Sequence, residues 1–442
     1  MKTEQVKLTG KKIGINGEGI AYLDKKPVFI EGLLPEETAV VQLSEDQPRY
    51  ARGKVIRRIN DSPVRVEAAC PLQQRCSGCP LMVMDREEQL KVKQELVREA
   101  LIKYAGIPAR KVSPVMASPQ SLGYRNQCKL PIRMEKGKLV NGLYEEGSNR
   151  MIPIRECLIH DPKLEKMRKK IMKLLNEAQC QVYQNRTKKG LRTLVLRGFD
   201  GHYQCTLVTG EDQLPESLVS KLSQLEGMDC LMQNIHPDHK SIQLFSDRWV
   251  TLHGQDKLPV QIGDLTLNLS CASFFQLNLP QAIQMYQKAA ELLEPCDMLV
   301  EAYSGVGGIS LMLKDKAKKI IGIEYVPQAV ENANENAKLN HADHVRFICG
   351  DAAREMKKLI RRQKIDAVVV DPPRSGLDEK MIKSLRECQP HQIIYISCNP
   401  ATLAKNLKEL KDLYQIRVIQ PYDMFPNTAH VETIVSLVSK EK

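Results

Sequence analysis

The sequence has few aromatic residues and no long apolar run. Phe, Trp and Tyr make up 5% of the 442 residues, and there is a single Trp. So few rings exclude an extended platform on which many unpaired bases stack. No apolar stretch approaches the roughly 20 residues that span a bilayer, and no apolar segment follows the charged start MKTEQVKLTGKK as it would in a signal peptide. We therefore expect a cytoplasmic protein without a membrane segment.

The chain has fewer acidic than basic residues, and its formal net charge is +12. The excess of basic residues is largest between residues 60 and 270, where 31 Lys and Arg stand against 24 Asp and Glu. RNQCKLPIRMEKGK, KLEKMRKKIMK and NRTKKGLR are the basic runs of this segment. A basic surface attracts polyphosphate backbones, which favours a nucleic-acid partner. A merely solvated basic face is the alternative.

Three parts of different patterning follow one another along the chain. Residues 1–59 hold about five short β-like runs separated by turn signals such as NGEG and LDKKP, as in a small β-barrel of the OB type. Residues 60–270 contain a helix ending near Gly106 and then an α+β mixture, with a hairpin in LRTLVLRGFDGHYQCTLVT. In residues 271–442, apolar strands alternate with helices, which predicts a Rossmann-like, mostly parallel sheet. We therefore predict a multidomain protein with these three domains.

A glycine-rich turn between a strand and a helix predicts a nucleotide site. In MLVEAYSGVGGISLML, Gly305, Gly307 and Gly308 let the backbone approach a ligand, and the helix start offers N–H groups. Glu324 ends the next strand, where an acidic group binds ribose hydroxyls in such folds, and Asp351 after the third strand suits an adenine amino group. The turn lacks the full G-x-G-x-x-G spacing and shows no pyrophosphate clamp. These features favour S-adenosylmethionine over NAD.

Two further strand ends and one strand start carry side chains that can react. Asp371 follows the strand of AVVVDPPRSGL, Cys398 follows that of QIIYISCNP, and Glu432 precedes that of HVETIVSLV. Strand ends in such folds open onto the ligand crevice, which favours a reactive Cys398 over a space-filling thiol. A thiolate that adds to C6 of uracil turns the ring into an enolate whose C5 attacks a methyl sulfonium, and a base must then remove the C5 proton. A structural Cys and a solvated Glu are the alternatives.

These motifs resemble the RNA uracil-5 methyltransferase family. The resemblance is carried by DPPRSG, SCNP, the glutamine of SFFQLN and HVET, and it covers essentially the whole chain because residues 1–59 look like a TRAM domain, the small RNA-binding barrel of this family. It implies methylation of uracil C5 in RNA from S-adenosylmethionine, with Cys398 as nucleophile and Glu432 as base. It also implies four residues at the cofactor, which are Gln276, Tyr303, Glu324 and Asp351. Asp371 matches an aspartate that contacts the cofactor or the target base.

One position departs from that family. Its first motif often reads DLFCG, whereas this chain has EAYSG, so that Glu301 stands in place of Asp. Tyr303 keeps the aromatic ring. We expect Glu301 to support the turn as the shorter acid does.

Three cysteines stand close together in CPLQQRCSGCP. Cys70, Cys76 and Cys79 have the spacing C-x5-C-x2-C. A zinc site usually shows paired C-x2-C motifs or a nearby His, whereas an iron–sulfur cluster takes four thiolates, and Cys157 is our candidate for a distant fourth. In TRAM-bearing members of the resembling family, this spacing and a later cysteine hold a 4Fe-4S cluster, and the match includes Cys157. Zinc and purely structural thiols stay open. Since the chemistry needs no electron transfer, we expect a structural cluster.

The substrate and the class of function leave alternatives. The resemblance implies 23S ribosomal RNA first and transfer RNA second, and we expect a monomer. An amino-methyltransferase is one rival, but Arg374 rather than an aromatic residue follows Asp-Pro-Pro, and such enzymes need no cysteine. A non-catalytic RNA-binding protein that kept the fold is the other. Cys398, Glu432 and the cofactor motif together argue against it.

Overall fold

The computed structural model describes residues 5–145 and 148–440. Contacts between residues divide the chain into two compact units. Unit 1 holds the described residues up to Ser121, Glu291–Cys296 and those from Met356 onward, and unit 2 holds Leu122–Ala290 and Asp297–Glu355. Each unit therefore combines segments that are far apart in the sequence. None of the helices in the described ranges is both long and apolar enough to cross a membrane.

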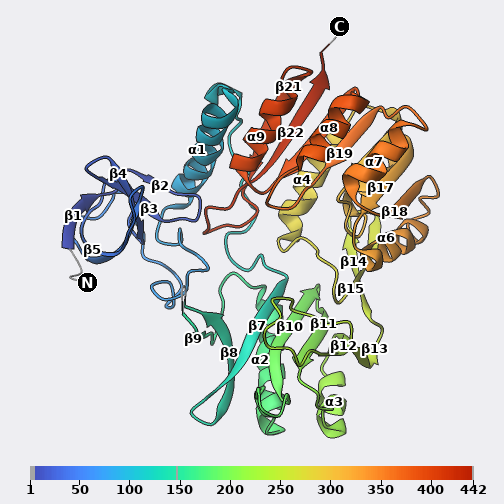
Figure 1. Cartoon of the computed structure of the whole chain (residues 1–442). Coiled ribbons are helices and arrows are strands. Elements are labelled where there is room, and N and C mark those ends of the chain that lie inside the picture. Colours follow the sequence, from blue (N-terminus) through green and yellow to red (C-terminus); the bar gives the residue numbers. More distant parts are fainter. Residues whose placement is uncertain (1–4, 146–147, 441–442) are drawn as a thin grey trace. The chain divides into compact units, whose positions relative to one another are not determined.

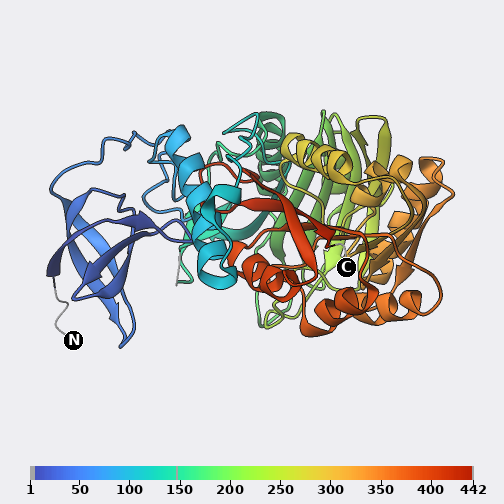
Figure 2. The same cartoon turned by 90° about the horizontal axis from the view of Figure 1, so that it is seen from above.

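The N-terminal part of unit 1 is a small six-stranded barrel, drawn in dark blue in Figures 1 and 2. Its strands lie in the order β1-β5-β6-β4-β3-β2. Asp24 and Lys25, both with positive φ, form the tight turn of the predicted LDKKP hairpin. The strands are β1 (Gln5–Thr9), β2 (Lys12–Ile13), β3 (Gly19–Leu23), β4 (Lys26–Glu31), β5 (Thr38–Asp46) and β6 (Ala51–Arg58). The predicted barrel is confirmed.

Helix α1 (Arg86–Ala105) follows the cysteine-rich segment of unit 1. The side chain of Asp85 caps its first turn, and Gly106 ends it in the left-handed conformation with φ of 66°, as the sequence predicts. The helix packs against α9 (Pro400–Leu410) of the same unit, beside which it lies in Figure 1. A short 3-10 turn (Ala109–Lys111) comes after it.

Four C-terminal strands of unit 1 lie in the order β19-β20-β22-β21. β19 and β20 are parallel, whereas β22 runs antiparallel to both β20 and β21. Every residue of β20 is buried, which explains why its four central residues, IIYI, form an apolar run rather than an alternating pattern. The bounds are β19 (Ala367–Val370), β20 (Gln392–Ser397), β21 (Tyr414–Tyr422), β22 (Glu432–Ser439) and the helix α8 (Glu379–Cys388).

A large sheet of unit 2 has the order β13-β12-β11-β10-β7-β8-β9. β10 and β11 pair antiparallel and confirm the predicted hairpin. Helices α2 and α3 pack against this sheet and against each other (Figure 1). The elements are β7 (Gln127–Glu135), β8 (Lys138–Tyr144), β9 (Met151–Pro153), α2 (Pro162–Glu177), β10 (Leu191–Phe199), β11 (His202–Thr209), α3 (Glu216–Ser223), β12 (Met228–Ile235) and β13 (Trp249–Gly254).

Unit 2 also contains three strands in the order β18-β17-β16, with β17 and β18 parallel. An antiparallel hairpin of β14 and β15 packs against helix α6. The strands and helices alternate as the sequence predicts. They are β14 (Lys257–Ile262), β15 (Leu265–Ser270), α4 (Leu279–Leu292), β16 (Cys296–Ala302), α5 (Gly308–Met312), a 3-10 turn (Lys314–Lys316), β17 (Ala317–Glu324), α6 (Pro327–Leu339), β18 (Val345–Cys349) and α7 (Ala352–Ile360). The last two residues of α4, the first residue of β16 and residues 356–360 of α7 belong to unit 1.

Candidate active site

Strand register brings the predicted reactive residues of unit 1 to one edge of its sheet. Asp371 directly follows β19 and Cys398 directly follows β20, and these two strands are parallel. Glu432 begins β22, whose next residue lies opposite the last residue of β20. The thiol and the two carboxyl groups interact electrostatically. The structure therefore groups Asp371, Cys398 and Glu432, as the three motifs predict.

Burial is the largest cause that raises the pKa of each member of this reactive group. Burial raises the pKa of Asp371 to about 7. Burial, with the charge of Asp371 as the second cause, raises the pKa of Glu432 to about 8. Burial and then the charges of Glu432 and Asp371 raise the pKa of Cys398 to about 11, while Arg374 acts weakly in the opposite direction. The group therefore combines a protonated thiol with a carboxylate of unusual basicity.

Hydrogen bonds tie the SCNP turn to the loop after β19. Asn399 caps α9 through its side-chain oxygen, and its Nδ2 donates to the carbonyl oxygen of Arg374 at 3.1 Å. Asn406 accepts from the hydroxyl of Tyr395 at 2.8 Å and exchanges two hydrogen bonds of 3.0 Å with the backbone of Leu377. Neither asparagine was among the predicted site residues. Asn before Pro at a helix start is an N-cap signal that identifies Asn399, whereas Asn406 has no such signal.

Helix α1 holds the loop between β21 and β22, which leads to the predicted base. The ammonium of Lys93 is fully buried and donates to the carboxylate of Asp423 and, at 2.9 Å, to the carbonyl oxygen of Phe425. The side chain of Gln89 accepts from the backbone N–H of Asn427 at 3.0 Å. Burial lowers the pKa of Lys93 to about 8, against the opposing charge of Asp423. Lys93 and Asp423 are 330 residues apart, so no local pattern predicts this contact.

The glycine-rich turn of unit 2 is shaped by the predicted ribose-binding acid. Tyr303 and Gly305 after β16 both have positive φ, 67° and 53°, and the N–H of Tyr303 donates to Ile323 at 2.9 Å. Glu324 ends β17 and accepts from the N–H groups of Gly305 at 3.0 Å and Val326 at 2.9 Å, one on each carboxylate oxygen. A carboxylate oxygen accepts more than one hydrogen bond. Glu324 can thus fix the turn and still receive ribose hydroxyls.

Glu301 supports the same turn, as we expect for a replacement of Asp. Its carboxylate accepts from the N–H of Ser310 at 2.8 Å and from the hydroxyl of that serine. Ser310 lies in α5, which follows the turn. A side chain at Gly307, where φ is 86°, would come within 2.6 Å of the ring of Phe347, so this turn requires glycine.

The remaining predicted cofactor residues lie in the same unit. A Cβ at Gly308, the first residue of α5, would lie 4.0 Å from the ring of Phe275, so the segment of Gln276 runs beside the helix start. Gln276 is buried, and its carbonyl oxygen accepts from the side chain of Asn126 at 2.9 Å. Asp351 follows β18 and caps α7 with its side chain. Asp351 therefore lies close to the end of a strand, where such folds bind ligands, whereas Gln276 lies in the segment between β15 and α4.

The candidate cluster ligands are divided between the units: Cys70, Cys76 and Cys79 lie in unit 1, and Cys157 lies in unit 2. All four are partly buried, and none forms a disulfide. Within residues 5–145 and 148–440, no group of three or more His, Cys, Asp or Glu side chains is placed to hold a metal ion. Burial raises the pKa of Cys157, and hydrogen bonds from the backbone N–H groups of Ile159 and His160 oppose this. Such donors suit a thiolate ligand, and the cluster stays a prediction.

Comparison with protein families matches nearly the whole chain. Residues 85–440 match the model of the tRNA (uracil-5-)-methyltransferase family, and residues 2–56 match the TRAM domain. A Bacillus cereus protein named "uncharacterized RNA methyltransferase" is 35% identical over 98% of this chain and 96% of its own length. A protein of the same name from Clostridium tetani is 36% identical over 98% of this chain and 95% of its own.

A solved structure is similar over the same extent. It is the Pyrococcus abyssi tRNA (uracil-54, C5)-methyltransferase in complex with S-adenosyl-L-homocysteine, with a TM-score of 0.76 and 26% identity over 98% of this chain and 100% of that chain. Together with the TRAM match, this similarity confirms the predicted multidomain fold class: an OB-type barrel, an α+β part and a Rossmann-like α/β part.

Proposed function

The chain belongs to the RNA uracil-5 methyltransferase family, and from this membership we propose that it methylates C5 of a uridine in 23S ribosomal RNA by covalent catalysis. The observation that carries the proposed mechanism is the grouping of Asp371, Cys398 and Glu432 at one sheet edge of unit 1. S-adenosylmethionine supplies a methyl group activated on a sulfonium. The RNA must present the target uracil out of its stack to reach the thiol.

Cys398 is the proposed nucleophile. Its Sγ adds to C6 of uracil, which makes C5 an enolate carbon able to attack the methyl group. The thiol has a pKa of about 11 without substrate, so only a small fraction is thiolate near neutral pH. Attack therefore accelerates as the pH rises or as the negative charges of Glu432 and Asp371 are neutralised.

Glu432 is the proposed base. After methylation, C5 carries both the methyl group and its original hydrogen, and loss of that proton expels Cys398 from C6. Burial raises the pKa of Glu432 to about 8, which makes its carboxylate a stronger base than an exposed Glu. Asp371, in the stiff loop after β19, is proposed to contact the target base or the methyl donor.

We propose six residues of unit 2 for binding S-adenosylmethionine. They are supported by their positions: Tyr303, Glu324 and Asp351 lie at or just after the ends of neighbouring strands. The carboxylate of Glu324 also holds the glycine-rich turn through the N–H of Gly305. We expect Glu324 to bind the ribose and Asp351 the adenine. The others are Gln276, Tyr303, Gly305 and Gly308.

For the cysteines, we propose the 4Fe-4S cluster with Cys70, Cys76, Cys79 and Cys157 as ligands. A structural role for the cluster is supported by a contact of the cysteine-rich segment. The backbone N–H of Leu81, two residues after Cys79, donates to the carbonyl oxygen of Asn427 at 3.0 Å, and Asn427 lies in the loop that leads to Glu432. The Cys76→Ala protein should lose its iron and its brown colour. Cys180→Ala is the matched control, since that thiol is also partly buried but outside the set. Iron per chain equal in both proteins would contradict the assignment.

Transfer RNA is the second candidate substrate, because the similar Pyrococcus abyssi enzyme is named for a tRNA uracil. The net charge of +12 supports an RNA partner of either kind. The expected cytoplasmic location and monomeric state stay predictions from the sequence.

The test uses 5-fluorouridine-substituted 23S rRNA and tRNA transcripts with S-adenosylmethionine, followed by a denaturing gel and peptide mapping. Fluorine at C5 cannot leave as a proton, so the covalent complex is trapped. We expect a denaturation-resistant complex with 23S rRNA, mapped to Cys398 and absent from Cys398→Ser. A complex with tRNA alone would keep the chemistry and change the substrate. No complex and no methyl transfer with either RNA would overturn the proposal.

A further inference from the structure

Two buried thiols of unit 2 face each other outside the predicted active site. The sulfurs of Cys230 in β12 and Cys271, directly after β15, are 3.6 Å apart. Their exposed fractions are 0% and 7%. A disulfide bond is about 2.05 Å long, so the two sulfurs would have to approach each other by about 1.5 Å to form one.

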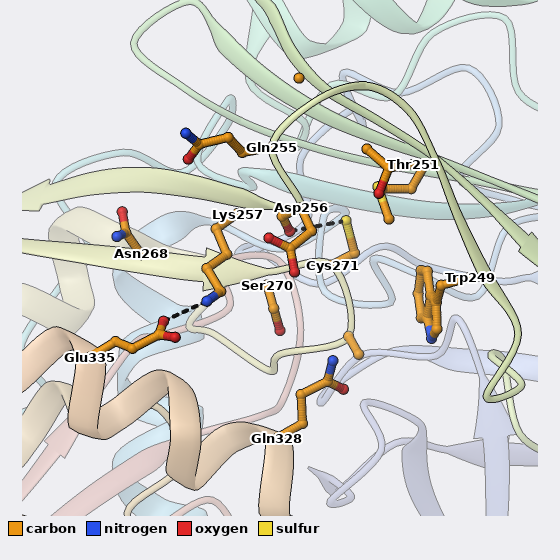
Figure 3. A pocket seen from close by; sticks show the side chains of 13 residues that line it. Trp249, Thr251, Gln255, Asp256, Lys257, Asn268, Ser270, Cys271, Gln328 and Glu335 are labelled. Carbon is orange, nitrogen blue, oxygen red and sulfur yellow. Dashed lines mark hydrogen bonds and ion pairs between the residues drawn. The ribbon is translucent and has the colours of Figure 1, made fainter.

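A pocket of about 510 Å³ gives access to one of the two thiols (Figure 3). Cys271 lines this pocket together with Trp249 and Asp256, and its sulfur lies 3.7 Å from the carbonyl oxygen of Asp256. An ion pair between Lys257 and Glu335 forms another part of the wall. Cys230 is fully buried behind the pocket lining. A small reagent that enters the pocket therefore meets Cys271 first.

The surroundings make the two thiols chemically unequal. The hydrogen bond between the two thiols is the main cause that lowers the pKa of Cys271; Thr206 and the charge of Arg197 add to it, and burial opposes it. The same hydrogen bond, together with burial, raises the pKa of Cys230. Arg197 is 2% exposed, and its guanidinium donates to the backbone of Ser270 at 3.1 Å, next to Cys271. Cys271 is thus the thiol that ionises more readily, and thiolates are the nucleophiles of thiol chemistry.

We propose that Cys271 and Cys230 form a hydroperoxide-sensitive dithiol site that closes to a disulfide, which an external thiol or phosphine reductant reopens. The Cys271 thiolate attacks the O–O bond of a hydroperoxide, is oxidised to a sulfenic acid and releases an alkoxide or hydroxide that takes up a proton. The Cys230 sulfur then attacks the sulfenic sulfur, the S–S bond forms, and hydroxide leaves with the Cys230 proton as water. Two thiols and one hydroperoxide thus give one disulfide, one alcohol or water, and one further water.

The dithiol site is continuous with the chain segment that contains Gln276, a predicted cofactor residue. The inference that oxidation affects cofactor binding rests on the proposed function. Cys271 begins the segment that ends at Gln276, and the guanidinium of Arg197 donates to the backbone of Ser273 within it. A bond from Cys271 to β12 would pull the start of this segment toward that strand. We expect oxidation to weaken S-adenosylmethionine binding by about tenfold, equivalent to about 1.4 kcal/mol.

The test begins with the reduced wild-type protein. It is treated with hydrogen peroxide, alkylated and digested, and the peptides are mapped by mass. We expect a peptide pair joined by Cys230 and Cys271, which a phosphine reductant separates. Trp249, the single Trp of the chain, packs against the two thiols, so its fluorescence should fall as the disulfide forms. Cys271→Ser and Cys230→Ser should lack both signals.

Cys205→Ser is the matched control, because Cys205 is also fully buried and lies in β11, beside β12. It should keep the disulfide and the fluorescence change. Peroxide that oxidises other thiols but never joins Cys230 to Cys271 in the wild-type protein would overturn the site. A disulfide that leaves S-adenosylmethionine affinity unchanged would overturn the link to the cofactor segment. Peptide mapping needs no catalysis, so failure of the proposed methyl transfer would be seen separately.

Discussion

Two buried glutamates in different units show how the surroundings decide what a carboxylate does. Glu165 of α2 is 3% exposed and Glu432 of β22 is 8% exposed. Burial alone would raise the pKa of Glu165, but hydrogen bonds from His160 at 2.7 Å and from Arg168 at 2.7 and 2.9 Å lower it to about 2. Within the described residues, the side chain of Glu432 has no ion pair or hydrogen bond, and its pKa rises to about 8.

The difference separates a structural acid from a reactive one. Glu165 and Arg168 form a charged buried pair at 2.7 Å, and Glu165 also accepts from the backbone N–H of Cys157 at 3.3 Å. Glu432 lies beside a second acid and a thiol instead, and it can gain or lose a proton near neutral pH. We therefore expect substitutions around Glu165 to act on stability and those around Glu432 to act on turnover.

The largest expected effect on turnover comes from Cys398→Ser. A serine hydroxyl does not supply a comparable nucleophile, so methyl transfer should fall below detection while the free energy of unfolding changes by less than about 1 kcal/mol. Methyl transfer from labelled S-adenosylmethionine and urea unfolding measure the two quantities. Turnover near the wild-type rate would remove Cys398 from the reactive group.

Glu165→Gln should have the opposite profile. Removing the charge leaves Arg168 buried without its counter-ion, which should lower the free energy of unfolding by about 3–5 kcal/mol. Methyl transfer per folded molecule should stay close to the wild-type rate. Glu177→Gln on the same helix is the control, because its exposed pair with Lys173 should contribute less than about 1 kcal/mol. Equal unfolding curves for the two variants would remove the contrast.

The two acids should also impose opposite pH dependence on stability. The folded pKa of Glu432 lies above its ordinary value, so the folded state holds a proton that the unfolded state loses, and stability falls as pH rises toward 8. The contribution of Glu165 is complete above its ordinary pKa and disappears only as pH falls toward 2. From about pH 5 to 8, Glu432→Gln should gain stability relative to wild type by at most about 1.4 kcal/mol per pH unit. Parallel curves for the variant and wild type in urea unfolding would argue against the raised pKa.

The smallest expected effect is on the thiol itself. Glu432→Gln removes a charge that raises the pKa of Cys398, so alkylation of Cys398 by iodoacetamide at about pH 9 should accelerate by a factor of up to about ten. Peptide mapping distinguishes this cysteine from the other twelve. Glu165→Gln should leave the rate unchanged, and an equal acceleration in that variant would show a general loosening of the fold.

Local patterns predicted the fold class and the placement of the reactive residues. Asp371, Cys398 and Glu432 each stand at the boundary of an apolar strand, and parallel or antiparallel register then brings such boundaries together. The contact of Lys93 with Asp423 and the approach of Cys230 to Cys271 join segments that are distant in sequence, so only the folded chain reveals them. The pKa of Glu432 also depends on its burial and on the approach of Asp371, which are properties of three-dimensional packing alone.

The most direct measurement is the fate of Glu432→Gln mixed with unmodified substrate RNA and S-adenosylmethionine. We predict that the methyl group is transferred once and that the RNA stays bonded to Cys398, because the glutamine cannot remove the C5 proton. A denaturing gel and mass analysis should show a protein–RNA adduct that carries a methylated uracil. Multiple turnovers with only unbound protein would contradict the assignment of Glu432 as the base.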